Sequence, residues 1–220
     1  IKFSHVIGDT EQHEKYEFLR RERVVCNGKC WVRPRQTHFK RMAELMGVER
    51  CKCPDTPVAA GDRGDLEIPD DVALDAEQHS TYRTVVGILL HIVVDRGDLG
   101  YSIRLVSRTI GQPTDSDWTR LNRLVKFAFG TREDWQLIEP TKESGNITTH
   151  VDSDWAGDKI TRKSCSCAVI RLDGVVLAMF VRGQKIEALS SAEAEFYAAV
   201  MGIAEALHIQ QLLAWLGDPR

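Results

Sequence analysis

The 220-residue sequence predicts a mixed α+β fold, and three observations lead to that prediction. Apolar residues recur at helical spacing across residues 82–93. Apolar and polar residues alternate across residues 147–152, as they do in a strand with one buried face. Two further strand-like segments, 165–172 and 175–181, are joined by an Asp-Gly turn. Hydrophobic residues make up 43% of the chain and charged residues 28%, which is typical of a globular domain and not of a disordered segment.

An Asn-Gly dipeptide at residues 27–28 predicts a β-hairpin near the N-terminus. This dipeptide supplies the two positive φ angles of a type I′ turn. The turn would pair Cys26 with Lys29 and Val25 with Cys30, so that neighbouring side chains along each strand point to opposite faces.

Four helices and one long loop are predicted between the hairpin and the last third of the chain. Apolar spacing predicts helices over residues 39–46, 82–93, 99–110 and 114–130, the last with a Thr-x-x-Asp capping box at its start. The acidic run 58–80, which contains glycine and proline, is predicted to be a loop. The middle of the chain is therefore expected to form a small helical unit.

The last third of the chain changes from helical to strand periodicity. The three predicted strands precede a Ser-x-x-Glu capping box at Ser190 and Glu193. The helix that this box begins is predicted to run to about Leu216 and to end at Gly217. We therefore expect a three-stranded sheet covered by one long helix.

The charge of the chain is unevenly distributed. The formal net charge is −3, but residues 1–57 carry a net +4 and residues 58–80 a net −6. The acidic stretch is typical of a linker, and the basic segment before it could bind phosphates. No apolar run approaches the roughly 18–20 residues of a membrane span, so no membrane partner is expected. The chain has neither an initiator Met nor a targeting segment at its start, which suggests a fragment of a longer intracellular protein.

Six cysteines occur in three close pairs, and without a secretion signal they are expected to be reduced thiols. The pairs are Cys26/Cys30, Cys51/Cys53 and Cys165/Cys167. A zinc module built from the first four is one alternative, but the predicted hairpin places Cys26 and Cys30 on opposite faces of the sheet. Because a closed zinc site needs four converging ligands, packing cysteines are the favoured interpretation.

Four acidic residues are the candidates for chemistry: Asp152, Asp154, Glu193 and Glu195. Glu193 has a structural role available, because its side chain can accept a hydrogen bond from the backbone N–H of Ser190 in the capping box. Asp152 lies at the end of the first strand of this region, and Asp154 follows it. In the simpler interpretation, the two aspartates cap the strand end and Glu195 faces solvent.

Glu195 lies at the start of a stripe of small residues on the long helix. Ala199, Gly202 and Ala206 follow it at i+4, i+7 and i+11, so this side of the helix could approach the sheet closely. The carboxylate would then lie beside the strand that ends at Asp152. Two such carboxylates repel each other unless a cation lies between them, and Mg²⁺ is held by one or two carboxylates together with water or substrate phosphates.

Two motifs around these acids resemble a known family. Residues 151–158 read Val-Asp-Ser-Asp-Trp-Ala-Gly-Asp, with Arg-Lys-Ser at 162–164, and residues 189–198 read Leu-Ser-Ser-Ala-Glu-Ala-Glu-Phe-Tyr-Ala. They resemble the start and the acidic helix of the ribonuclease H domain in copia-type LTR-retrotransposon Pol polyproteins. Upstream, residues 82–90, with short matches after them, resemble the segment between reverse transcriptase and ribonuclease H. Residues 18–21 and the basic hairpin resemble the tail of the reverse transcriptase.

The resemblance implies four segments. They are a reverse-transcriptase tail over 1–57, an acidic linker over 58–80, a helical connection over 81–145, and the N-terminal part of a ribonuclease H-like domain over 146–220. By the same resemblance the protein would act in a cytoplasmic particle or the nucleus, next to the rest of the polyprotein.

The resemblance also implies an activity for the acids. Asp152 and Glu195 would bind Mg²⁺, two ions in the complete domain, and the domain would hydrolyse the RNA strand of RNA–DNA hybrids. Five arginines of the basic segment would contact phosphates without reading base sequence. These are Arg20, Arg21, Arg23, Arg33 and Arg35.

The sequence departs from the family pattern in its last residues. The family supplies further metal-binding acids after the long helix, the next in an Asp-Asn motif on a following strand, and this sequence ends at 218–220 before such a strand. We therefore expect the domain to be inactive alone and its incomplete sheet to favour self-association through an unpaired edge. The alternative function is a non-catalytic nucleic-acid-binding remnant of a decayed element.

Overall fold

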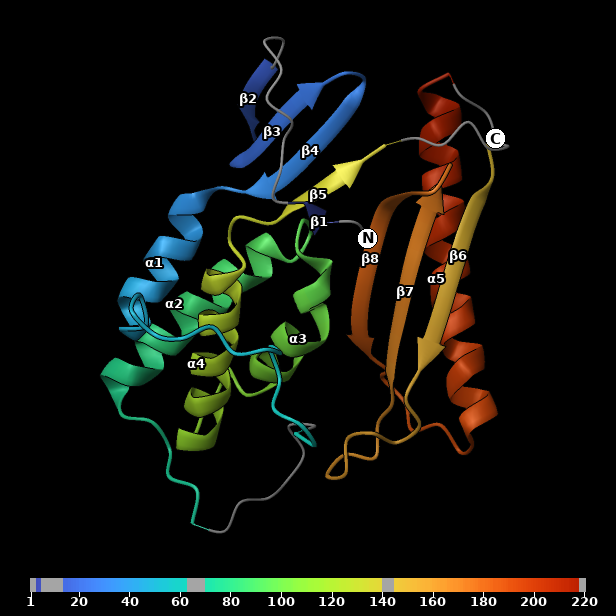
Figure 1. Cartoon of the computed structure of the whole chain (residues 1–220). Coiled ribbons are helices and arrows are strands. Elements are labelled where there is room, and N and C mark those ends of the chain that lie inside the picture. Colours follow the sequence, from blue (N-terminus) through green and yellow to red (C-terminus); the bar gives the residue numbers. More distant parts are fainter. Residues whose placement is uncertain (1–2, 5–13, 63–69, 140–144, 218–220) are drawn as a thin grey trace. The chain divides into compact units, whose positions relative to one another are not determined.

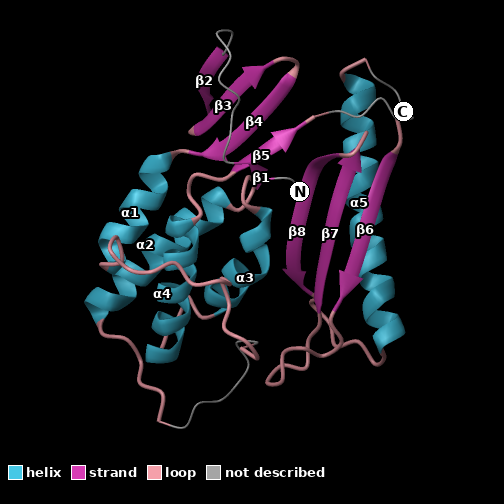
Figure 2. Ribbon diagram, in the orientation of Figure 1, coloured by secondary structure: helices cyan, strands magenta, loops and turns pink. Residues whose placement is uncertain are grey.

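A computed structural model describes residues 3–4, 14–62, 70–139 and 145–217, and it confirms the α+β fold class. The chain divides into two compact units, residues 1–137 and 138–220. Both combine helices with antiparallel strands (Figures 1 and 2). Within the described ranges no helix is long and apolar enough to cross a membrane.

The sheet of the first unit contains the predicted hairpin. Its strands are ordered β1-β5-β4-β3-β2. They span Phe3–Ser4 (β1), Glu14–Phe18 (β2), Arg21–Cys26 (β3), Lys29–Pro34 (β4) and Trp135–Ile138 (β5). Cys26 pairs with Lys29 and Val25 with Cys30, as the Asn-Gly turn predicted. The two turn residues have φ angles of 50° and 72°, which are the left-handed values of a type I′ turn.

Four α-helices enclose the main hydrophobic core of the first unit (Figure 1). They span Gln36–Met46 (α1), Ala76–Ile92 (α2), Gly100–Arg108 (α3) and Asp115–Gly130 (α4), and a 3₁₀ turn at Gly97–Leu99 precedes α3. All four helices predicted in this region are confirmed. Their fully buried side chains include Phe39, Met42, Tyr82, Leu89 and Leu121.

Local signals at the helix ends explain where the chain enters and leaves each helix. Gly47 ends α1 with a φ of 63°, and Thr114 and Asp117 form the predicted capping box of α4. The prediction of loop up to residue 80 is wrong at its end, because α2 begins at Ala76. The side chain of Asp75 accepts a hydrogen bond from the backbone N–H of Gln78 and thereby caps this helix.

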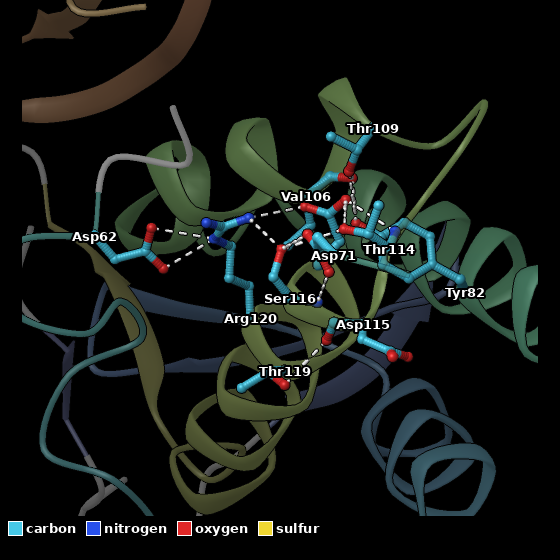
Figure 3. A network of polar contacts seen from close by, with 11 residues as sticks. Asp62, Asp71, Tyr82, Val106, Thr109, Thr114, Asp115, Ser116, Thr119 and Arg120 are labelled. Atoms are coloured by element: carbon cyan, nitrogen blue, oxygen red, sulfur yellow. Dashed lines mark hydrogen bonds and ion pairs between the residues drawn. The ribbon is translucent and has the colours of Figure 1, made fainter. Parts of the chain in front are cut away.

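The acidic segment before α2 is attached to α4 at two points (Figure 3). Arg120 of α4 forms ion pairs with Asp62 and Asp117, both at 3.0 Å. Asp71 accepts hydrogen bonds from the backbone and the hydroxyl of Ser116, at 3.1 Å and 2.6 Å. These acids therefore stabilise the helical unit instead of lying free in solvent. Residues 63–69 of the predicted linker lie outside the described residues.

The second unit is a three-stranded antiparallel sheet with one long helix on it, as predicted (Figure 2). Its strands are Ile147–Ser153 (β6), Cys165–Leu172 (β7) and Val175–Gly183 (β8), in the order β6-β7-β8. The Asp-Gly turn at 173–174 has positive φ at both residues and connects β7 to β8. Helix α5 spans Ser191–Trp215 and is followed by Gly217 with a φ of 86°.

Two helical glycines provide a matched test of this packing. A methyl group at Gly202 of α5 would lie 2.4 Å from Val151 Cγ1, whereas nothing lies within 4 Å of a methyl group at Gly87 of α2. Gly202→Ala should lower the free energy of unfolding, because overpacking costs about 1–3 kcal/mol and outweighs the helical preference for alanine. Gly87→Ala should raise the stability by about 0.5–1 kcal/mol. Chemical denaturation measures both, and a change of the same sign in the two variants would contradict the close contact.

Candidate functional site

Helix α5 packs against β6 and β7 along its small residues. Ala194, Ala198 and Gly202 are buried on the side that faces the sheet. An added methyl group at Gly202 would meet Val151 Cγ1 at 2.4 Å and Thr149 Cγ2 at 3.0 Å. The face of β6 that carries odd-numbered residues is therefore the one that α5 covers.

Asp152 lies on the other face of the sheet. Side chains alternate along a strand, so Asp152 points away from the face on which Val151 meets α5. Asp152 is exposed, and its partner across the sheet is Cys167 of β7. The predicted metal-binding aspartate is thus accessible to solvent, but it does not share a face of the sheet with the long helix.

Glu195 reaches the end of β6 from the helix. Its Oε1 accepts a hydrogen bond from the backbone N–H of Ser153 at 3.3 Å. The backbone N–H of Asp154 donates to the carbonyl of Cys165 in β7, so the N–H of the preceding residue points to the opposite edge of β6, which pairs with no other described strand. The Glu195 carboxylate therefore lies at the outer edge of β6, beside the peptide that joins Asp152 to Ser153.

Asp154 has a structural role. Its carboxylate accepts a short hydrogen bond from the backbone N–H of Cys165. A methyl group at Gly157 would overlap the same carboxylate, so glycine leaves room for it there. Asp154 therefore holds the loop that connects β6 to β7, and one oxygen of its carboxylate is engaged by this bond.

The capping box of α5 differs from the prediction in one hydrogen bond. Ser190 accepts from the backbone N–H of Glu193 at 3.1 Å, as expected. The Glu193 carboxylate, however, accepts from the backbone N–H of Leu189 at 2.7 Å and not from that of Ser190. Its structural role holds, because it still satisfies a backbone donor at the start of the helix.

Two polar side chains whose roles the sequence patterns did not predict position the start of α5. The amide of Gln184 is buried and donates to the Ser166 hydroxyl and to the Ala194 carbonyl, both at 2.9 Å. The indole N–H of Trp155 donates to the carbonyl of Ala188 at 3.0 Å. The Gln184 bonds connect the ends of β7 and β8 to the first turn of the helix that carries Glu195, and the Trp155 bond connects the segment after β6 to the residues just before that helix. Neither contact follows a periodic pattern, so sequence analysis had no signal for them.

The thiol of Cys167 reports the electrostatics of this strand end. Its pKa is raised, first by burial and then by the negative charge of Asp152. Glu195 and Asp154 raise the pKa further. The negative charges of all three carboxylates therefore reach the Cys167 thiol at the ends of β6 and β7. Asp152 and Glu195 lie on different sides of this strand end.

This arrangement fits a metal ion only in part. Among the described residues, no group of three or more His, Cys, Asp or Glu side chains is placed to hold a metal. Asp152 and Glu195 could contribute two oxygen ligands at the edge of β6, with water or substrate phosphates completing the octahedral shell that Mg²⁺ requires. The two residues do not constitute a preformed two-metal centre.

Four of the five predicted phosphate-binding arginines interact with other residues of the chain. Arg33 bonds to Glu22 and Glu133 at 2.8 Å, and it stacks over the Trp135 ring. Arg21 forms an ion pair with the buried Asp95 at 3.1 Å.

The remaining three arginines differ in their burial. Arg23 is half-buried, and it has interactions within the chain. Arg20 and Arg35 are exposed, and Arg35 also pairs with Glu17 at 3.2 Å. These two are therefore the arginines of the predicted set that remain accessible to a phosphate.

Comparisons with known proteins relate the chain to mobile elements. The Retrovirus-related Pol polyprotein from transposon RE2 of Arabidopsis thaliana is 30% identical over 138 residues, which cover 62% of this chain and 9% of the polyprotein. The corresponding polyprotein from transposon TNT 1-94 of Nicotiana tabacum is 25% identical over 196 residues, which cover 86% and 14%. The chain is distantly related to copia-type retrotransposon Pol polyproteins.

Most of the RE2 and TNT 1-94 polyproteins lies outside the part that matches this chain. An uncharacterized mitochondrial protein of A. thaliana is also 29% identical over 126 residues, covering 57% of this chain and 52% of that protein. No family profile and no solved structure matches the chain. The comparisons therefore show a relation to Pol polyproteins but no activity of this chain.

The Cys167 thiol provides a direct test of the acid geometry. Asp152→Asn and Glu195→Gln are each expected to lower its pKa, because the loss of a nearby negative charge favours the thiolate. The pH dependence of iodoacetamide alkylation of the Cys167 peptide, followed by mass spectrometry, measures this shift. Glu205→Gln on the same helix is the control and should leave the pKa unchanged. An unchanged pKa in the Glu195→Gln variant would mean that the two acids do not act on the same strand end.

Proposed function

We propose that the 138–220 unit is part of a ribonuclease H-like nuclease domain of a retrotransposon Pol polyprotein. In this proposal Asp152 and Glu195 bind Mg²⁺, and the completed domain hydrolyses the RNA strand of RNA–DNA hybrids. The hydrogen bond from the Ser153 backbone N–H to Glu195 supports this proposal. It holds the Glu195 carboxylate at the edge of β6, next to the residue that follows Asp152 in the sequence.

The free edge of β6 supports the idea that the domain is completed by a further strand. Within the described part of the second unit, β6 pairs with β7 on one side only. A strand added at the other side would run past the Glu195 carboxylate. It could bring further acidic side chains beside those already there. An unpaired edge can also pair with a second copy of the chain, so self-association would compete with completion.

In the proposed reaction, different residues of the chain would have different roles. The Ser153 N–H fixes the Glu195 carboxylate, Gln184 fixes the first turn of the helix that carries it, and Trp155 fixes the segment just before that helix. Exposed Asp152 is accessible to a hydrated Mg²⁺ ion, through which it would act on a phosphate of the substrate. Bound Mg²⁺ would activate the attacking water and stabilise the leaving oxygen. Recognition of RNA would depend on the 2′-hydroxyl groups and the shape of the hybrid, not on base edges.

Hybrid cleavage by a lengthened chain tests the proposal. The sequence should be expressed with the coding region that follows it, through the next acidic strand, and assayed on an RNA–DNA hybrid with Mg²⁺. Cleavage should require Mg²⁺, and Asp152→Asn or Glu195→Gln should reduce it by at least about 100-fold, since each removes a group that stabilises the transition state.

The matched control is Glu205→Gln. This residue lies ten positions later on α5, about 15 Å along the helix axis, and pairs with the exposed Arg182 at 2.8 Å. Its substitution should leave cleavage unchanged. A lengthened, folded chain that retains Asp152 and Glu195 but shows no Mg²⁺-dependent cleavage would refute the nuclease proposal.

A further inference from the structure

Three elements of the first unit bring two histidines together. His38 lies in the first turn of α1, and His91 in the last turn of α2. Their ring centroids are 5.0 Å apart, and the rings are tilted by 59°. The tight turn at Leu19–Arg20, which connects β2 to β3, lies beside them, because the backbone N–H of Arg35 donates to the Arg20 carbonyl at 3.3 Å.

The side chain of His38 has an unsatisfied polar atom. Its Nε2 is buried and has no hydrogen-bond partner among the described residues. Buried polar atoms in native proteins are nearly always hydrogen-bonded, so this unpaired ring nitrogen is unusual. The neighbouring His91, Arg20 and Arg35 are exposed, so this part of the surface is open to a ligand.

The charges around the pair favour an anion over a metal cation. The pKa of His38 is lowered, first by burial and then by the positive charges of His91, Arg20 and Arg35, which Glu17 opposes. A cation shared by the two imidazoles would face the same positive charges. Among the described residues, no third metal-ligating side chain is placed to complete a metal site here.

The other charged groups near His91 balance one another in part. Asp95 is buried, and burial raises its pKa, while Arg21, Arg23 and His91 lower it. Arg21 contacts Asp95 directly at 3.1 Å. This carboxylate is therefore compensated within the chain, and the exposed side of the cluster remains positive.

We propose that His38, His91, Arg20 and Arg35 form a binding site for a phosphate group. The two arginines would supply charge-assisted N–H donors, since Arg35 keeps donors in excess of those that pair with Glu17. The Nε2 atom of His38 is buried and would not itself contact the phosphate, but the negative charge of the phosphate would favour the protonated form of this ring. Binding would then take up a proton and would strengthen as the pH falls through the pKa of His38. This inference does not depend on the nuclease proposal, because the site lies in the other unit of the chain.

Histidine NMR of the full chain tests this site. Inorganic phosphate, added at constant ionic strength against a chloride reference, should shift the ring resonances of His38 and His91 in a saturable manner. It should also raise the pH midpoint of His38. Arg20→Gln combined with Arg35→Gln should weaken phosphate binding at least about tenfold. Arg41→Gln, an exposed arginine of α1 that pairs with Glu44 at 4.0 Å, is the matched control and should leave binding unchanged.

A short nucleic-acid duplex distinguishes the two sources of phosphate. If the site contacts the nucleic-acid backbone, the duplex shifts both histidines, and the double variant lowers the salt slope of log K by about 2. If inorganic phosphate alone shifts them, the site takes a free phosphate group. Circular dichroism confirms that the variants fold. The proposal is overturned if neither ligand shifts the pair, if the double variant binds as tightly as the parent, or if Zn²⁺ shifts the pair and phosphate does not.

Discussion

The close approach of α5 to β6 is the constraint on which the second unit depends. Gly202 has no side chain where the helix crosses β6, so Val151 and Thr149 can lie against the helix backbone. That contact fixes the height of the helix above the sheet, and its first turn then lies level with the end of β6. Glu195 can reach the Ser153 backbone only because the helix lies this close. A larger residue at Gly202 would move the carboxylate away from the strand end as well as weaken the packing.

In the first unit, ion pairs and hydrogen bonds of arginines hold the structure together. They also reduce the number of arginines that are available to bind a phosphate. Arg96 is almost fully buried, and its guanidinium bonds to Asp98 and to Thr131, 35 residues later. Arg33 and Arg120 are likewise engaged by carboxylates. A buried arginine of this kind holds distant segments together, and it is not available to an external phosphate. The net positive charge of residues 1–57 is therefore larger than the positive charge that a nucleic acid would contact at the surface.

Local signals in the sequence predicted the elements well. The Asn27-Gly28 turn, the Thr114 capping box and Gly47 each act within a few residues, so they specified the hairpin and the helix ends correctly. The start of α2 was placed too late, because its cap, Asp75, is one acid in an acidic run and its role depends on a single hydrogen bond.

The candidate site was less predictable, because its contacts are long-range. Alternation along β6 already put Asp152 and Val151 on opposite faces, but only the packing of Gly202 shows which face α5 covers. The partners of Arg21 and Arg33 could not be anticipated either, since Asp95 and Glu133 lie far from them in sequence. The His38–His91 contact joins residues 53 positions apart and follows no motif.

We propose that Asp152 and Glu195 act together at the edge of β6. Carbon-13 NMR of their side-chain carboxyl groups during a Mg²⁺ titration can show whether they do. We expect both resonances to move with one shared apparent dissociation constant, while Glu205 stays unchanged. If the two carboxyl groups respond with separate constants, or if neither responds in a chain lengthened through the next acidic strand, they do not form one cation site.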